Sequence, residues 1–210
     1  LTVEKDTEYV DFGYLYINDT DALIYFLEQL PNLRRVDMYA TAIWRRTADD
    51  LAERFPQVSF GWSLRLGDHI IRTDDQVFST SHDNGSKGHY SADFEVLRYC
   101  PGLMALEISR NEVDNLSFLR YVPNLRVLVV SSNEISDLSP VSGCTPLESL
   151  ALSYNQIEDV TPLSNLAGLK DLNLSHNRVV DWTPLMRLKG LRQLWIYAGS
   201  GEGEATLEFS

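Results

Sequence analysis

The feature that most constrains this chain is a pair of residue types that return at a fixed interval in its C-terminal half. Leucines recur every 22 residues, and asparagines follow them with the same period. The leucines are Leu103, Leu125, Leu147, Leu169 and Leu191, and the asparagines are Asn111, Asn133, Asn155 and Asn177. A fixed period of this kind indicates a stack of similar structural units.

One unit, written from its first leucine, has the spacing L-x-x-L-x-L-x-x-N-x-I. It contains Leu147, Leu150, Leu152, Asn155 and Ile157. The last two leucines are separated by one residue, which suits a short strand with one buried face. The asparagine falls where the chain leaves the strand, and its amide can bond to the backbone of adjacent turns. No unit of this size buries its own apolar face, so neighbouring units must stack.

This spacing resembles the leucine-rich repeat. The stretches Ser136–Pro140 and Glu158–Leu163 make the units similar to the short repeats of bacterial internalin-type surface proteins. Similar units occur in a eukaryotic phosphatase-regulating family. The resemblance covers about residues 100–198. It implies an α/β leucine-rich-repeat solenoid, with a curved parallel sheet on the concave face, helices and extended turns on the convex face, and protein recognition on the concave sheet.

The region before residue 99 follows the same pattern less regularly. The strand positions are occupied by Leu33, Val36 and Met38, and the asparagine place by Thr41. We expect a helix that Asp21 caps and Pro31 ends, and a second helix at about residues 47–55. Full helices in place of extended turns explain why these units are longer than the later ones.

The 22-residue register is lost between residues 58 and 103. We expect a strand at 58–64 that turns back through Gly67-Asp68, a strand near 76–79, and a short helix with Ser91 as its cap. The predicted organisation is therefore irregular, helix-containing repeats at 1–98, with a loop excursion at about 80–90, then regular repeats at 99–198. Residues 199–210 are predicted to be a flexible segment or a cap, with a strand-like alternation at 205–210.

Charge and hydropathy exclude several classes of partner. The chain has 210 residues, a formal net charge of −12 and a pI near 4.7. Nucleic acid is not expected as a partner, because phosphate binding needs a basic surface. No run approaches about eighteen apolar residues, so we expect no membrane insertion. We expect a monomer.

Two predictions concern burial. Cys100 and Cys144 occupy the same repeat position two units apart, which separates them by roughly 9–10 Å in a parallel stack. A disulfide tolerates a Cα separation of only about 7 Å, so we predict two free, buried thiols. Trp182 occupies the position of Leu116, Leu138 and Val160, so it is also predicted to be buried.

Candidate chemistry is sparse. The stretch from His82 to His89 contains two histidines and an aspartate, but its glycines and its spacing fit a solvated loop better than a metal site. The pairs Asp49-Asp50 and Asp74-Asp75 are neighbours in sequence only, whereas acid–base catalysis needs groups that converge on a pocket. We therefore expect no enzyme activity, no metal and no cofactor.

The residues that alternate with buried leucines should face outward on the concave sheet. Those predicted to bind a partner are Glu107, Arg110, Val129, Ala151, Tyr154, Asn173, His176, Trp195 and Tyr197. Small side chains in the middle let a partner approach, and exposed aromatic side chains commonly anchor interfaces. An alternative for Trp195 and Tyr197 is that they cover the open end of the stack.

These observations predict a non-enzymatic protein-recognition module that binds a partner protein through its concave face. The internalin-type resemblance implies an extracytoplasmic bacterial location, secreted or at the cell surface. One alternative is an intracellular scaffold or regulatory subunit resembling the phosphatase-binding family. Another is a structural accessory domain of a larger surface protein.

Overall fold

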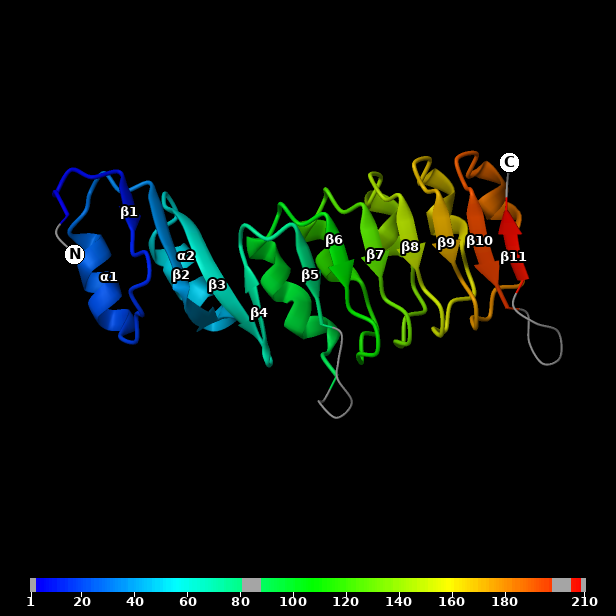
Figure 1. Ribbon diagram of the computed structural model, residues 1–210, viewed down its shortest axis with the longest axis horizontal. Helices are drawn as coiled ribbons and strands as arrows, with labels where there is room; N and C mark the ends of the chain where they lie inside the picture. Colours follow the sequence, from blue (N-terminus) through cyan, green and yellow to red (C-terminus); the bar gives the residue numbers. More distant parts are fainter. Residues whose placement is uncertain (1–2, 81–87, 198–204, 209–210) are drawn as a thin grey trace. The chain divides into compact units, whose positions relative to one another are not determined.

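The computed structural model describes residues 3–80, 88–197 and 205–208, with only the backbone at 205–208. The chain forms two compact units, residues 1–75 and 76–210, and each unit has its own sheet (Figure 1). The sequence predicts a change from irregular to regular repeats at residues 98–99. The boundary between the two compact units lies earlier in the chain, at residues 75–76.

Unit 1, residues 1–75, contains a four-stranded sheet in the order β1-β2-β3-β4. The parallel strands are β1 (Tyr9–Asp11), β2 (Arg35–Trp44) and β3 (Ser59–Leu66). Helix α1 (Thr20–Glu28) connects β1 to β2, and α2 (Arg45–Arg54) connects β2 to β3. Strand β4 (His69–Arg72) runs back antiparallel to β3, and Gly67 in the turn has a φ of +55°. The predicted reversal at Gly67 is confirmed.

Both helix caps that were predicted before residue 99 are wrong. Asp19 caps α1, because it has an extended backbone and its Oδ1 accepts a hydrogen bond from the Ala22 N–H at 2.9 Å. Asp21 instead lies in the first turn of the helix. At the later helix the cap is Tyr90. The Ser91 hydroxyl donates to Asp114 Oδ1 at 2.6 Å, so it bonds to the next repeat.

Unit 2, residues 76–210, contains a seven-stranded sheet in the order β11-β10-β9-β8-β7-β6-β5. The parallel strands are β5 (Val77–Ser79), β6 (Ala105–Glu107), β7 (Val127–Val129), β8 (Ser149–Ala151), β9 (Asp171–Asn173) and β10 (Gln193–Ile196). Strand β11 (Ala205–Glu208) pairs antiparallel with β10. The strands follow one another in a single row (Figure 1).

Short 3-10 helices make the return connections between the strands of unit 2. They are η1 (Ser91–Tyr99), η2 (Ser117–Tyr121), η3 (Ser139–Gly143), η4 (Thr161–Asn165) and η5 (Thr183–Arg187). This is an α/β leucine-rich-repeat solenoid, in which each repeat consists of one strand and one helical return. Within the described ranges, none of the helices has the length and apolar character that a membrane crossing requires.

The core of unit 2 is a column of leucines in matched register. Leu106, Leu128, Leu150, Leu172 and Leu194 are consecutive register partners, and all are buried. Cys100 and Cys144 lie in the same core as free, buried thiols, so that prediction is confirmed. Burial raises the pKa of the Cys144 thiol to about 11, which keeps the thiol protonated and unreactive at neutral pH.

The repeating asparagines link adjacent units through their side-chain amides. Asn155 Nδ2 donates to the carbonyls of Val130 and Leu152, each at 3.0 Å, and its Oδ1 accepts from the Ile135 N–H at 3.0 Å. Asn133 and Asn177 make the equivalent bonds in their own units. Each asparagine therefore satisfies backbone groups of two units in the buried turn.

Trp182 departs from its predicted burial. It is only partly buried, although its equivalents in earlier units, Leu138 and Val160, are fully buried. Trp182 leads into η5, and in the described chain no further helix packs on the outer side of η5. Together with Leu185 and Leu188 it lines an apolar cavity of about 520 Å³. The sequence equivalence was correct, but within residues 3–80 and 88–197 no following repeat covers this position.

Each regular unit also has a carboxylate or amide that closes the turn before its 3-10 helix. Asp137, Asp159 and Asp181 accept the backbone N–H two residues later at 2.8, 2.8 and 2.9 Å. Asn115 takes this place in an earlier unit, at 3.3 Å from the Ser117 N. Hydrogen bonds from the hydroxyl and the N–H of the following Ser or Thr lower the pKa of all three aspartates.

Replacement of Asn155 by alanine should destabilise unit 2 strongly. The substitution leaves the buried Ile135 N–H without its acceptor and removes a donor from two carbonyls, for an expected loss of about 2–4 kcal/mol in the free energy of unfolding. Urea denaturation measures the loss. The control is Asn165→Ala, at an exposed asparagine that makes no such bonds, and it should change stability by less than about 0.5 kcal/mol. Equal effects of the two variants would contradict the role assigned to Asn155.

The three turn aspartates should make stability depend on pH in the acid range. Their pKa values are lower in the folded chain, so their contribution is present above the unfolded pKa of about 4 and is lost as the pH falls through the folded values. The triple variant Asp137→Asn, Asp159→Asn, Asp181→Asn keeps a side-chain acceptor at each turn, as Asn115 does. The gap in unfolding free energy between the two proteins should shrink from pH 7 to pH 3. A gap independent of pH would contradict this expectation.

Candidate functional site

One face of the unit 2 sheet carries three rows of side chains that alternate with the buried leucines, and we call it the open face. The first row is Ala105, Val127, Ser149, Asp171 and Gln193, and the second is Glu107, Val129, Ala151, Asn173 and Trp195. The third row follows the strands and is Ser109, Ser131, Ser153, Ser175 and Tyr197. The second row contains five of the predicted site residues, and register pairing places them next to one another.

The middle of the open face is small and apolar. Val129 and Ala151 are register partners, and both are partly buried. Glu107 stands at one end of the second row, where its carboxylate accepts from the Ser79 hydroxyl and from the Ser109 N–H at 3.0 Å. Trp195 stands at the other end, in β10. The face therefore changes from a bonded carboxylate through small side chains to an aromatic one.

The position just before each asparagine has a left-handed backbone. Arg110, Ser132, Tyr154 and His176 have φ values of 58°, 58°, 57° and 56°. No glycine occupies this position, although a left-handed backbone costs most other residues about 1–2 kcal/mol. The recurrence in four units shows that the repeat imposes this geometry. Three of the predicted site residues, Arg110, Tyr154 and His176, share it.

Three predicted site residues form a continuous stack of rings. The rings of Tyr154 and His176 lie 3.9 Å apart at 13°, and those of His176 and Tyr197 lie 4.3 Å apart at 27°. The Tyr154 side chain remains 56% exposed. Stacked rings restrain one another, so this aromatic ladder offers a contact surface with little rotamer freedom left to lose on binding.

A hollow of about 320 Å³ lies at the C-terminal end of the open face. Its walls are formed by the first and second rows of β8, β9 and β10. They include Ser149, Ala151, Asp171, Asn173, Gln193 and Trp195. The small side chains of Ser149 and Ala151 do not fill the hollow, and Trp195 forms one of its walls. Asp171 and Gln193 were not among the predicted site residues, although the alternation that identified Asn173 and Trp195 applies equally two positions earlier.

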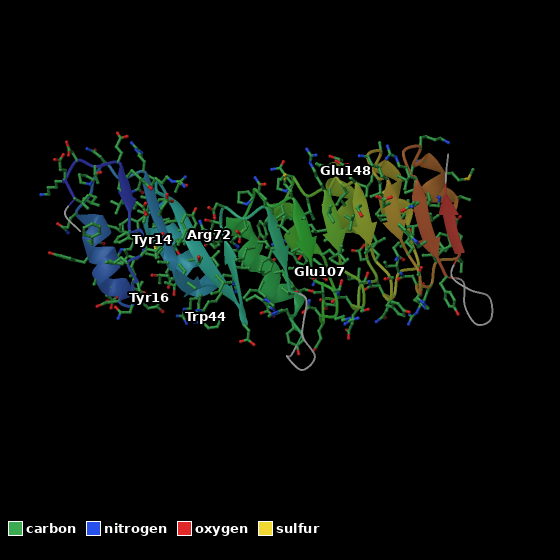
Figure 2. The ribbon with its side chains drawn as sticks, viewed as in Figure 1. Tyr14, Tyr16, Trp44, Arg72, Glu107 and Glu148 are labelled. Carbon is green, nitrogen blue, oxygen red and sulfur yellow. The ribbon has the colours of Figure 1, made fainter. Side chains whose placement is uncertain are left out.

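The edge that leads into the strands carries a row of charged side chains. Glu148 forms ion pairs with Arg126, at 3.4 Å, and with Lys170. The hydrogen bond from Lys170 and its charge lower the pKa of Glu148. Figure 2 shows Glu148 and Glu107 toward opposite ends of the strands, so this pairing lies at the edge of the open face.

Unit 1 has a separate polar cluster on its own sheet. Arg35 forms an ion pair with Asp37 at 3.0 Å, and the Tyr9 hydroxyl donates to the same carboxylate at 3.0 Å. The Arg72 guanidinium lies 4.0 Å from the centre of the Tyr39 ring. A Cβ on Gly61 would lie 2.2 Å from Asp37 Oδ1, so only glycine leaves room for this arrangement.

The stretch at residues 82–89 was predicted to be a solvated loop rather than a metal site, and residues 82–87 of it lie outside the described residues. Across residues 3–80 and 88–197, no group of three or more His, Cys, Asp or Glu side chains is arranged to hold a metal ion. His89 is buried, with its ring centre 6.0 Å from that of Phe94.

Comparison with known families decides the identity of the repeats. Residues 123–165 match the family model described as leucine rich repeats in two copies. Residues 123–165 are leucine-rich repeats. No curated protein sequence matches the chain. The matched residues span β7, β8, η3 and η4, where the register is most regular.

Two solved structures from Listeria monocytogenes are similar to this chain. One is an internalin, InlF, with 22% identity over 90% of this chain and 48% of its own, and a TM-score of 0.47. The other is an internalin C2, with 20% identity over 81% of this chain and 74% of its own, and a TM-score of 0.49. The chain spans about half the length of the first.

Replacement of Ser132 by glycine should stabilise unit 2, because glycine adopts a left-handed backbone without a steric cost. Ser132→Gly removes a backbone cost of about 1–2 kcal/mol, against about 0.5–1 kcal/mol for the extra freedom of glycine in the unfolded chain. We expect a net gain of about 0.5–1 kcal/mol in urea denaturation. The matched control is Ser136→Gly, at an exposed serine outside the left-handed set, which should lose stability. A loss in both variants would contradict the strain at residue 132.

Proposed function

We propose that this leucine-rich repeat protein is a non-enzymatic recognition module that binds a partner protein through the open face of unit 2. The observation that carries the proposal is the aromatic ladder of Tyr154, His176 and Tyr197 beside the second row of the sheet. Tyrosine and tryptophan are enriched among the few residues that contribute most of the binding energy at protein interfaces. Solenoid sheets also commonly provide extended binding surfaces.

The composition of the open face supports a protein partner. Val129 and Ala151 have small side chains, so a partner can approach the backbone closely in the middle of the face. Trp195 and Tyr197 raise its C-terminal end, and Arg110 and Glu107 add charge at the other end. An apolar centre with aromatic anchors and a polar rim is the usual arrangement of a protein interface. The net charge of −12 favours a neutral or basic partner.

We place this function outside the bacterial cytoplasm, secreted or at the cell surface, and expect the module to act as a monomer. The support for this location is the similarity of the 22-residue units to internalin-type repeats. The free, buried thiols are compatible with it, because neither Cys100 nor Cys144 is accessible to oxidation.

Removal of two anchors should abolish partner capture without unfolding the chain. The immobilised full chain and its Tyr154→Ala, Trp195→Ala variant are exposed to host-cell and bacterial extracts, and bound proteins are identified by mass spectrometry. We expect at least one protein whose capture falls about tenfold or more in the variant, since interface aromatics contribute about 2 kcal/mol or more each.

The control is Tyr25→Ala, at an exposed aromatic residue on helix α1 of unit 1, and it should capture the same protein as the unmodified chain. Thermal melting separates binding from structure. An unchanged melting temperature with lost capture supports the open face as the interface. A large drop in melting temperature would instead assign Trp195 to covering the end of the stack, and equal capture by all three proteins would contradict the proposal.

A further inference from the structure

The hollow on the open face contains polar side chains that have no partner among residues 3–80 and 88–197. Asp171 forms no ion pair or side-chain hydrogen bond with any residue in 3–80 or 88–197, and the same holds for the side chain of Gln193. Other partly buried carboxylates of the chain are paired, such as Glu95 with Arg98 and Arg120. An unpaired carboxylate at the wall of a hollow is available to a cation from outside.

The arrangement of the walls restricts which cation fits. Asp171 and Gln193 are register partners, and Asn173 and Trp195 are the next outward-facing pair on the same strands. With strands about 4.8 Å apart and outward residues about 6.6 Å apart along a strand, Asp171 and Trp195 are diagonal neighbours about 8 Å apart at Cα. A planar group between them can meet the carboxylate through its edge and the indole through its face.

A guanidinium group has that combination of properties. Its donors bind a carboxylate in a bidentate manner, and its plane stacks on aromatic rings. A lysine ammonium is a compact, strongly hydrated charge and cannot make both contacts in this way. The Gln193 side-chain carbonyl adds an acceptor beside the carboxylate. We propose that the hollow formed by Asp171, Gln193 and Trp195 is a subsite for one arginine side chain of the partner protein.

The charge around the hollow agrees with a single arginine. The three rows of the open face, from Ala105 to Tyr197, contain the carboxylates Glu107 and Asp171 and no lysine or arginine. The neighbouring edge row contains Arg126, Lys170 and Arg192, with Glu148 paired to the first two. A second basic residue of the partner on that side would meet Arg192. The subsite therefore selects an isolated arginine rather than a polybasic run.

The inference rests on the proposed protein-binding function and is tested on the full chain with small probes. The indole N–H signal of Trp195 is followed by NMR during titration with N-acetyl-arginine amide. The matched probe is N-acetyl-citrulline amide, which has nearly the same shape and no charge. We expect a saturable shift with the arginine probe and binding weaker by about tenfold or more with citrulline, as loss of a charged hydrogen bond predicts.

The variant Asp171→Asn removes the charge at constant size and should bring the affinity for the arginine probe down to that for citrulline. Asp137→Asn, at a turn outside the open face, should leave the preference for arginine intact. Equal binding of the two probes, or an unchanged preference in Asp171→Asn, would overturn the subsite. Thermal melting of each variant ensures that a lost shift is not lost folding.

Failure of the subsite and failure of the proposed function give different results. Capture of a protein partner that depends on Tyr154 and Trp195 but is unchanged in Asp171→Asn overturns the arginine subsite and leaves protein recognition standing. Capture that falls in both variants supports both, provided that an arginine in the captured protein is required. Capture unchanged in every variant overturns both.

Discussion

The hydrogen bonds of the repeating asparagines are the interaction on which unit 2 depends. Its regular strands are only three residues long, so the sheet ladder leaves many backbone groups of the turns to be satisfied elsewhere. Each asparagine amide reaches a carbonyl and an N–H of the preceding unit as well as a carbonyl of its own. This geometry fixes the register of each strand and its turn against those of the preceding repeat.

Unit 1 shows what happens when that requirement is relaxed. Thr41 occupies the asparagine place, and its hydroxyl accepts only one backbone bond, from Ile17 at 2.7 Å. The neighbouring backbone is satisfied mainly by a longer ladder, since β2 extends over ten residues with an irregularity between Met38 and Ala42. Longer strands tolerate repeats of different length, and the repeats of unit 1 contain full helices. In unit 1, the loss of the asparagine therefore occurs together with longer strands and unequal repeat lengths.

The parts of the structure that follow from periodicity could be predicted from the sequence. The leucine column, the free thiols of Cys100 and Cys144, and the row from Glu107 to Trp195 all follow from register alone. Local competition decided what was missed. Asp19 and Asp21 are both good capping residues, and only the backbone geometry separates them. The partial exposure of Trp182 depends on a neighbouring repeat that the pattern presupposes. The residue types also do not reveal the left-handed backbone of Tyr154 and His176, whose rings stack.

At the left-handed position before each asparagine, the backbone geometry stays constant while the side chain varies. Arginine, serine, tyrosine and histidine occupy it in successive units with φ values that agree within 2°. The asparagine that follows holds the turn, so the preceding side chain contributes little to it. Such a position can exchange a charge for a hydroxyl or an aromatic ring while its direction of projection stays constant. The repeat thereby provides a row of sites at which recognition chemistry can diversify without redesign of the scaffold.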